Sequence, residues 1–410
     1  MSLQGPIIVV SSTGRPSFAG ALEQAKLFPV IVTPWPDASG AVARMTPAAV
    51  LVAEGATEPQ LQALANQIAA ITPYVPLIAL NATTSLPDNA IPCGQIGDNS
   101  DRLIARLRSA LRVRTLHSTV LRRTIDADPA VRATFERTDP VADATVLLIG
   151  RGAAYPSLSV SFGERMGVVG ALSIEAAAKH LNSRDINGIA LGAGFSPRVE
   201  HAFLTVLAED TRFRNLPIVV TSDAVTPAYD LPNLEIISAE PARVAANALP
   251  LIRQHAFESQ LGRMLKSIEA GGLLDPKTGL LAPHAFDRDF ANTVGHTLSR
   301  GGGLSVARFA FDPNSSRAQI DGARILSRLM RQMDFGAAQE DGSVIVVFAE
   351  TDLRTAHMVA RRLSSVIRHT SHSKRDTGLG PVVTVATLLP SDSDKSLMAR
   401  LYDEACRAAS

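Results

Sequence analysis

The sequence predicts an α/β protein of three domains: two doubly wound parallel sheets, followed by a smaller α+β domain. Strand-like and helical segments alternate over residues 1–118 and again over residues 145–257. The strands there are continuous apolar runs, which is typical of parallel sheets covered on both faces. Beyond residue 273 the pattern changes, because an Asp-Gly turn joins two strand-like runs within Phe335–Phe348 and predicts a β-hairpin. A length of 410 residues fits this division.

Composition and charge narrow the classes of function. The net charge of +1 gives no reason to expect a nucleic-acid partner. Cys93 and Cys406 are the only cysteines, so neither a disulfide framework nor a zinc site is expected. No apolar run approaches the roughly 20 residues of a membrane span, and the start MSLQGPIIVV lacks the basic segment of a secretory signal. We expect a cytoplasmic protein without membrane insertion, metal or cofactor.

The first predicted domain, residues 1–118, has the spacing of a flavodoxin-like sheet. Its strands are expected at Pro6–Ser11, Pro29–Thr33, Ala48–Glu54 and Val75–Leu80, with a fifth near Pro92. Its helices are expected at Phe18–Lys26, Pro59–Ala70 and Asp101–Leu116. Residues 119–144 form a polar linker with a short helix at Pro129–Arg137. Seven arginines along Asp101–Arg123 indicate a solvated helix face, with a docking surface as the alternative.

The second predicted domain, residues 145–257, repeats this alternation. Its strands are expected at Thr145–Gly150, Gly167–Leu172, Asn187–Leu191, Leu216–Ser222 and Leu234–Ser238. Its helices are expected at Ser157–Met166, Ile174–Ser183 and Ser196–Glu209. A long helix at Pro241–Leu274 closes the domain and includes the linker at residues 258–272.

The third predicted domain, residues 273–410, places the hairpin among three helices and two further strands. The helices are expected at Pro283–Ser299, Leu353–Thr370 and Ser393–Ala409. The strands outside the hairpin are expected at Leu304–Phe311 and Pro381–Leu389.

The first two domains resemble the receiver domains of two-component signalling, most clearly in the strand Pro217–Ser222. A working receiver holds Mg²⁺ with acidic residues after its first strand, because metal and phosphoryl group must be neutralised together. Here Ser11 and Ser12 follow the first strand of one domain, and Gly150 and Arg151 that of the other. Glu54 is either an acidic stand-in for the phospho-acceptor or a polar strand end. We therefore expect neither domain to be phosphorylated.

Two short Gly-x-Gly stretches in the second domain raise the question of dinucleotide binding. They are Gly150–Gly152 and Gly192–Gly194, and neither continues into the full Gly-x-Gly-x-x-Gly pattern. A dimerisation or adaptor module is the better interpretation of this domain.

The third domain resembles the GGDEF domain of diguanylate cyclases, whose fold is nucleotidyl-cyclase-like. Asp275, Thr278, Gly279 and Leu280 match the entry motif of that family, Asp-x-Leu-Thr-Gly-Leu. The signature hairpin falls on residues 340–344, which read EDGSV in place of GGDEF. Enzymes of that family condense two GTP molecules into cyclic di-GMP, and the resemblance implies that the third domain has their fold.

The positions that carry catalysis in that family are altered here. Ala310 stands where a metal-binding Asp is expected, and Asp312 occupies the position of the second Asp. In the hairpin, Glu340 and Asp341 replace the two glycines, and Gly342 and Ser343 replace the acidic pair. Two Mg²⁺ ions normally neutralise the triphosphate, so losing their carboxylates removes that chemistry. We expect a degenerate cyclase with no catalytic residues.

The inhibitory, product-binding motif of the family, Arg-x-x-Asp, is intact as Arg331 to Asp334. An Arg side chain can fork onto a phosphate or a guanine edge, and a carboxylate can accept from guanine N1–H and N2–H₂. The family completes the site with a second arginine on the helix after the hairpin, which is Arg362 here, with Arg361 beside it. The bland alternative is a surface ion pair between Arg331 and Asp334.

The order receiver, receiver, GGDEF resembles PleD-type response regulators over nearly the whole chain. The resemblance implies a cyclic di-GMP effector of the cell cycle that works as a homodimer. It further implies placement at a cell pole and recruitment of adaptor proteins for an ATP-dependent protease. A residual diguanylate cyclase and a nucleotide-independent dimeric scaffold are the two alternatives.

Overall fold

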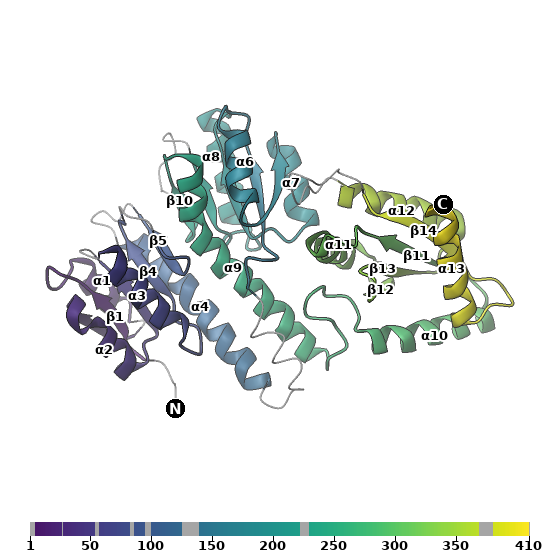
Figure 1. Cartoon of the computed structure of the whole chain (residues 1–410), viewed down its shortest axis with the longest axis horizontal. Helices are drawn as coiled ribbons and strands as arrows, with labels where there is room; N and C mark the ends of the chain where they lie inside the picture. Colours follow the sequence, from purple (N-terminus) through teal and green to yellow (C-terminus); the bar gives the residue numbers. More distant parts are fainter. Residues whose placement is uncertain are drawn as a thin grey trace. The chain divides into compact units, whose positions relative to one another are not determined.

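A computed structural model gives the structure of the chain and describes residues 5–26, 28–53, 57–82, 86–94, 100–124, 139–221, 229–368 and 380–409 (Figure 1). The chain divides into two compact units. Unit 1 comprises Met1–Met166, Gly170–Ile174 and Asn187–Leu261, and unit 2 comprises Gly167–Val169, Glu175–Ile186 and Gly262–Ser410. Each unit is described by itself. Within the described residues, no helix is long and apolar enough to cross a membrane.

The first sheet is parallel, with strand order β2-β1-β3-β4-β5. This is the order of flavodoxin-like doubly wound sheets. Its strands are β1 (Ile7–Val10), β2 (Val30–Thr33), β3 (Ala49–Val52), β4 (Leu77–Leu80) and β5 (Ala90–Cys93). Its helices are α1 (Phe18–Gln24), α2 (Trp35–Met45), α3 (Glu58–Ala69) and α4 (Asp101–Thr124).

Alternate side chains of the central strand β1 enter two different cores. Ile7 and Val9 pack with Leu22 and Leu107 on one face of the sheet. Ile8 and Val10 pack with helices α2 and α3 on the other face. Because both faces are covered, every residue of β1 is buried, and this explains its continuous apolar run.

The second sheet has the order β10-β9-β8-β6-β7, the same winding as the first. Its strands are β6 (Thr145–Ile149), β7 (Gly167–Ala171), β8 (Gly188–Leu191), β9 (Ile218–Val220) and β10 (Leu234–Ile236). Its helices are α6 (Tyr155–Gly163), α7 (Ile174–Ser183), α8 (Pro197–Glu209) and α9 (Pro241–Glu269). The predicted helix at Pro129–Arg137 lies outside the described residues, as does Glu54.

The arginine run on α4 is only partly a solvated face. Arg106 is fully buried and donates to the backbone carbonyls of Pro92, Pro232 and Leu234. Its guanidinium also lies 3.0 Å from the Glu235 carboxylate. The expectation of a solvated helix face is therefore wrong at Arg106. Backbone carbonyls and a carboxylate from distant parts of the chain surround its side chain.

The third sheet is antiparallel, with strand order β12-β13-β11-β14. Its strands are β11 (Leu304–Ala310), β12 (Phe335–Ala338), β13 (Val344–Ala349) and β14 (Val382–Thr387). The helices are α10 (Pro283–Arg300), α11 (Ser316–Leu329), α12 (Leu353–Arg368) and α13 (Asp394–Ala409). From β11 to β14 the elements follow a βαββαβ order, which gives a two-layer α+β core.

The two faces of this sheet have separate cores. Phe309, Val346 and Phe348 pack against α11 and α12 on one face. Val306 and Ile345 pack against α10 and α13 on the other. Side chains on the second face of β11 therefore point toward α13. Arg308 is two residues beyond Val306, so its side chain lies on this same face.

A buried ion pair lies within unit 2. The Arg184 guanidinium, fully buried, lies 3.3 Å from the Asp321 carboxylate on α11 and donates to the Val366 carbonyl. Desolvation lowers the pKa of Arg184, and the charge and hydrogen bond of Asp321 partly offset this. Such a pair holds α11 in place only while both partners are present.

Candidate functional site: the hairpin and the turn before it

The predicted hairpin is confirmed. Ala338 of β12 pairs with Val344 of β13, and Gln339 N–H donates to Ser343 O at 2.8 Å. Gly342 N–H donates to Gln339 O at 3.0 Å, and Gly342 has φ of +77°. A turn followed by a left-handed glycine is a three-residue hairpin loop with a bulge, so this position favours glycine.

An arginine lies beside the hairpin loop. Arg308 on β11 donates to the Asp341 carboxylate at 2.7 Å and to Ser343 Oγ at 3.2 Å. The same guanidinium lies 5.2 Å from the ring centroid of Tyr402 on α13. Asp341 also accepts from Ser343 Oγ at 2.6 Å. The hairpin carboxylate is thus already neutralised by a residue of its own chain.

Gln319 of α11 covers the tip of the loop. A Cβ atom at Gly342 would meet the Gln319 side chain at 2.4 Å. Gln319 Nε2 in turn donates to the Asp312 carbonyl at 3.0 Å. A side chain at position 342 would therefore have to displace the end of the Gln319 side chain.

Ala310, Asp312 and Glu340 do not converge on a metal site. Ala310 ends β11 and is half-buried, while Asp312 and Glu340 are exposed. The Asp312 carboxylate accepts from the Asn314 N–H within its own loop at 2.9 Å. Among the described residues, no group of His, Cys, Asp and Glu side chains could hold a metal ion.

The Arg-x-x-Asp motif forms a tight turn and not the end of a helix. Helix α11 ends at Leu329, and Asp334 N–H donates to the Arg331 carbonyl at 3.0 Å. From the i, i+3 spacing we expected Arg331 and Asp334 at the end of a helix, with both side chains on one helical face, and this expectation is wrong. The turn lies immediately before β12, between α11 and the hairpin.

Within that turn the two side chains have different environments. Arg331 is exposed, and in the described part of the chain its side chain makes no hydrogen bond or ion pair. Asp334 is 8% exposed, and its Oδ2 accepts from Arg331 N–H at 3.4 Å. The structure shows no ion pair between the Arg331 and Asp334 side chains, which was the alternative interpretation of the motif.

The Asp334 carboxyl group is poorly satisfied. Its Oδ1 is buried and has no hydrogen-bond partner of ordinary geometry among the described residues. Burial raises the pKa of Asp334, and the N–H groups of Arg331 and Ala349 and the charge of Arg331 offset this only in part. A buried acceptor without a donor is uncommon in folded proteins, so this oxygen needs an explanation.

Arg361 and Arg362 lie on the outer side of α12. Their neighbours Ala360 and Leu363 are buried in the core, whereas both arginines are exposed. Neither side chain enters an ion pair or hydrogen bond in the described part of the chain. No contact joins either of them to Arg331 or Asp334, so the four predicted ligand residues do not form a closed pocket.

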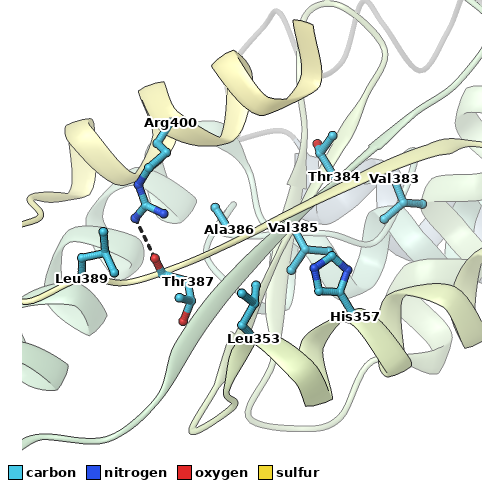
Figure 2. A pocket seen from close by; sticks show the side chains of 9 residues that line it. All are labelled: Leu353, His357, Val383, Thr384, Val385, Ala386, Thr387, Leu389 and Arg400. Carbon is cyan, nitrogen blue, oxygen red and sulfur yellow. Dashed lines mark hydrogen bonds between the residues drawn. The ribbon is translucent and has the colours of Figure 1, made fainter. Parts of the chain in front are cut away.

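A separate pocket borders β14 on its outer edge (Figure 2). Its volume is about 450 Å³. It is lined by Leu353 and His357 of α12, Val383–Thr387 of β14, Leu389 and Arg400. The sequence patterns did not point to this pocket or to Arg308, Gln319 and Tyr402. The only available signal was an arginine inside an otherwise apolar strand.

The switch point of the second sheet is closed. Arg151 N–H and Gly152 N–H both donate to the Ala193 carbonyl, at 3.0 and 2.9 Å. A Cβ atom at Gly194 would meet Arg151 at 2.9 Å. Gly152 and Gly194 therefore allow two loops to pack closely together. These loops lie at the edge where doubly wound sheets otherwise bind ligands.

No family model matches the chain, and neither does any curated protein. The coiled coil and GGDEF domain of DgcB from Caulobacter crescentus, solved with c-di-GMP, is 16% identical, with a TM-score of 0.30. That match covers 35% of this chain and 85% of the other.

Two further solved structures are similar at the same level or below. The FimX GGDEF domain from Pseudomonas aeruginosa is 17% identical with a TM-score of 0.28, covering 33% of this chain and 94% of that one. A 2-hydroxyacid dehydrogenase from Ketogulonicigenium vulgare is 13% identical with a TM-score of 0.17, covering 65% and 96%. TM-scores this low carry no conclusion about fold or ligand.

Proposed function

We propose that the third domain is a GGDEF domain that has lost its cyclase activity, and that the chain is an effector of cyclic di-GMP. In this proposal Arg331 and Asp334 are the primary ligand residues, and Arg362 and Arg361 complete the site. The observation that carries it is the combination of an exposed Arg331 with an unsatisfied Asp334 Oδ1 in one turn directly before the hairpin.

Charge and hydrogen bonding support this assignment of the ligand. The Arg331 guanidinium is exposed and makes no hydrogen bond or ion pair in the described part of the chain, so it is available to fork onto a phosphate or a guanine edge. Guanine offers N1–H and N2–H₂ donors on one edge, and the buried Asp334 Oδ1 has no partner of ordinary hydrogen-bond geometry among the described residues, so it would reach guanine once the carboxylate turned outward. The Oδ2 contact with Arg331 N–H is long, at 3.4 Å, so turning the carboxylate toward a ligand sacrifices little.

The arrangement around the hairpin supports the loss of synthesis. Arg308 holds Asp341 and Ser343, and Gln319 covers Gly342. A metal-bound triphosphate would have to displace both side chains, and it would then meet Ala310 in place of a ligand carboxylate. We therefore expect no cyclic di-GMP from GTP and Mg²⁺.

The wider role remains part of the same proposal. A homodimer that recruits adaptor proteins of an ATP-dependent protease, at a cell pole and in cell-cycle control, follows from the resemblance to PleD-type regulators. Mixing Arg331→Ala chains with Arg362→Ala chains tests whether Arg362 serves the site of its own chain or of a second copy, because mixed dimers regain one intact site only in the second case.

Calorimetric titration of the full chain with cyclic di-GMP tests the proposal. We expect a dissociation constant of about 1 µM or lower, and at least about tenfold weaker binding for Arg331→Ala. Gln332→Ala is the matched control, because Gln332 is exposed in the same turn. If Arg331→Ala binds as tightly as the wild type, Arg331 is not part of the nucleotide site. If the wild-type chain does not bind the nucleotide, the alternative of a nucleotide-independent scaffold is favoured. Formation of cyclic di-GMP from GTP would favour the alternative of a residual diguanylate cyclase.

A further inference from the structure

We propose that the outer edge of β14 is a docking site for an extended segment of a partner protein, which adds a strand to the third sheet. The segment would carry apolar side chains at alternate positions and acidic side chains between them. This inference does not depend on nucleotide binding.

The register of the sheet shows which backbone groups face outward. Leu388 N–H donates to the Leu304 carbonyl at 2.8 Å, so this pair is hydrogen-bonded. Hydrogen-bonded and non-hydrogen-bonded pairs alternate along an antiparallel ladder. Since Arg308 pairs with Thr384 and Ala307 with Val385, Thr384 bonds to β11, whereas Val383 and Val385 direct their N–H and C=O groups to the open edge.

The position of Arg400 agrees with this assignment. Its guanidinium donates to the Thr387 carbonyl at 2.6 Å from the edge side (Figure 2). Thr387 is two residues beyond Val385 and has the same orientation. In the described part of the chain, no group bonds to the outward N–H and C=O of Val383 and Val385, which leaves a short unpaired edge of the kind that accepts another strand.

The pocket along this edge has the chemistry of an unfilled interface. Two of its apolar lining residues, Leu353 and Leu389, are 41% and 44% exposed, and Val382, which precedes the lining residues of β14, is 56% exposed. Thr384 lines the pocket, and its Oγ1 is buried without a hydrogen-bond partner among the described residues. An incoming strand would cover the apolar groups and supply polar partners at the edge.

The charge of the adjacent helix favours an acidic segment. Helix α12 contains no Asp or Glu, and its exposed residues include Arg354, His357, Arg361, Arg362 and Arg368. Leu353 and His357 line the pocket, and the same i, i+4 row continues to Arg361. Arg400 is already paired with Asp392, so the available positive charge lies on α12.

The same charge disfavours a second copy of this chain as the occupant. Two β14 strands paired edge to edge would bring two α12 helices toward each other. Both helices are basic and lack acidic residues, so their exposed faces would repel. A partner of opposite charge removes this cost, and we therefore assign the edge to another protein.

Fluorescence anisotropy of the full chain with a labelled peptide in which Val alternates with Glu tests the proposal. Val383→Pro removes one outward N–H and leaves the ladder to β11 intact, so we expect about tenfold weaker binding. Val383→Ala keeps that N–H and is the matched control. His357→Glu is a second variant on an exposed position, and we expect it to weaken binding while the protein stays folded.

The outcomes separate the possible occupants. Equal binding by Val383→Pro and Val383→Ala would overturn strand addition. A peptide with Lys in place of Glu that binds equally well would overturn the acidic partner. Self-association that Val383→Pro abolishes would assign the edge to a second copy, and absence of binding to the wild-type chain would overturn the site. Titration with cyclic di-GMP should be unchanged in Val383→Pro, which distinguishes this site from the nucleotide site.

Discussion

Arg308 of β11 and Asp341 of the hairpin loop form an ion pair with a separation of 2.7 Å. We expect Arg308→Met, which keeps the apolar stem, to lower the free energy of unfolding by about 1 kcal/mol. Asp341 is nearly half exposed, so screening limits the contribution of the pair, and the contact with Tyr402 adds to it. Urea unfolding of both proteins measures the difference.

The pH dependence of this pair provides a check. Partial burial raises the pKa of Asp341, but the hydrogen bonds from Ser343 and Arg308 outweigh it, and the pKa is lowered overall. The contribution to stability is therefore present above the unfolded value of about 3.9 and is lost as the pH falls through the lower folded value. If the gap between wild type and Arg308→Met persisted unchanged below that range, the pair would not be its origin.

Gly342 is constrained by both its backbone and Gln319. We expect Gly342→Ala to destabilise the fold by about 1–2 kcal/mol, because φ is +77° and the new Cβ meets the Gln319 side chain at 2.4 Å. In a Gln319→Ala background the steric part should disappear while the backbone part stays. A double-mutant cycle measured by thermal unfolding separates the two, and strictly additive effects would show that Gln319 does not cover the loop.

Asp334 should oppose stability while serving binding. Because burial raises its pKa, the folded chain holds the proton more tightly than the unfolded one. Stability therefore falls as the pH rises from about 3.9 toward the raised folded value, and stays at the lower level above it. Asp334→Asn should unfold at a higher temperature than the wild type at neutral pH, and should bind cyclic di-GMP about tenfold or more weakly.

A stabilised variant that loses its ligand is characteristic of a functional residue, whereas a structural residue loses stability when replaced. In the wild type, binding should also weaken as the pH falls through the raised pKa of Asp334, and Asp334→Asn should lack this step. A destabilised Asp334→Asn with normal nucleotide affinity would exclude the carboxylate from the site.

The sequence patterns predicted the helices, strands and sheets more accurately than they predicted the side-chain contacts. Continuous apolar strands such as Ile7–Val10 identified both parallel sheets, and the Asp-Gly turn identified the hairpin. Helix α2 was not predicted, because its sequence contains the weak helix formers Pro36, Ser39 and Gly40, and its buried side is made of the small residues Ala38, Ala41 and Val42. The long helix α9 ends five residues before its predicted end at Leu274, at Glu269, since Gly271 and Gly272 have positive φ.

The contacts depend on register and chain crossing, which spacing does not encode. Arg106 belongs to a charged run, yet it is buried because distant carbonyls surround it. Arg308 reaches the hairpin only because its face of β11 points toward α13 and Ser343. The motif at Arg331 was found from its distance to the hairpin, but its turn geometry was not.

The arginines of α12 provide the last prediction. Arg361 and Arg362 are exposed and make no described ion pair, so Arg362→Ala should change the free energy of unfolding by less than about 0.5 kcal/mol. It should nevertheless weaken cyclic di-GMP binding about tenfold by calorimetry, through loss of a charge-assisted contact. Arg354→Ala removes an exposed positive charge from the same helix and is the matched control. Equal losses in both variants would indicate general attraction by a basic helix, which salt would suppress, and would remove Arg362 from the site.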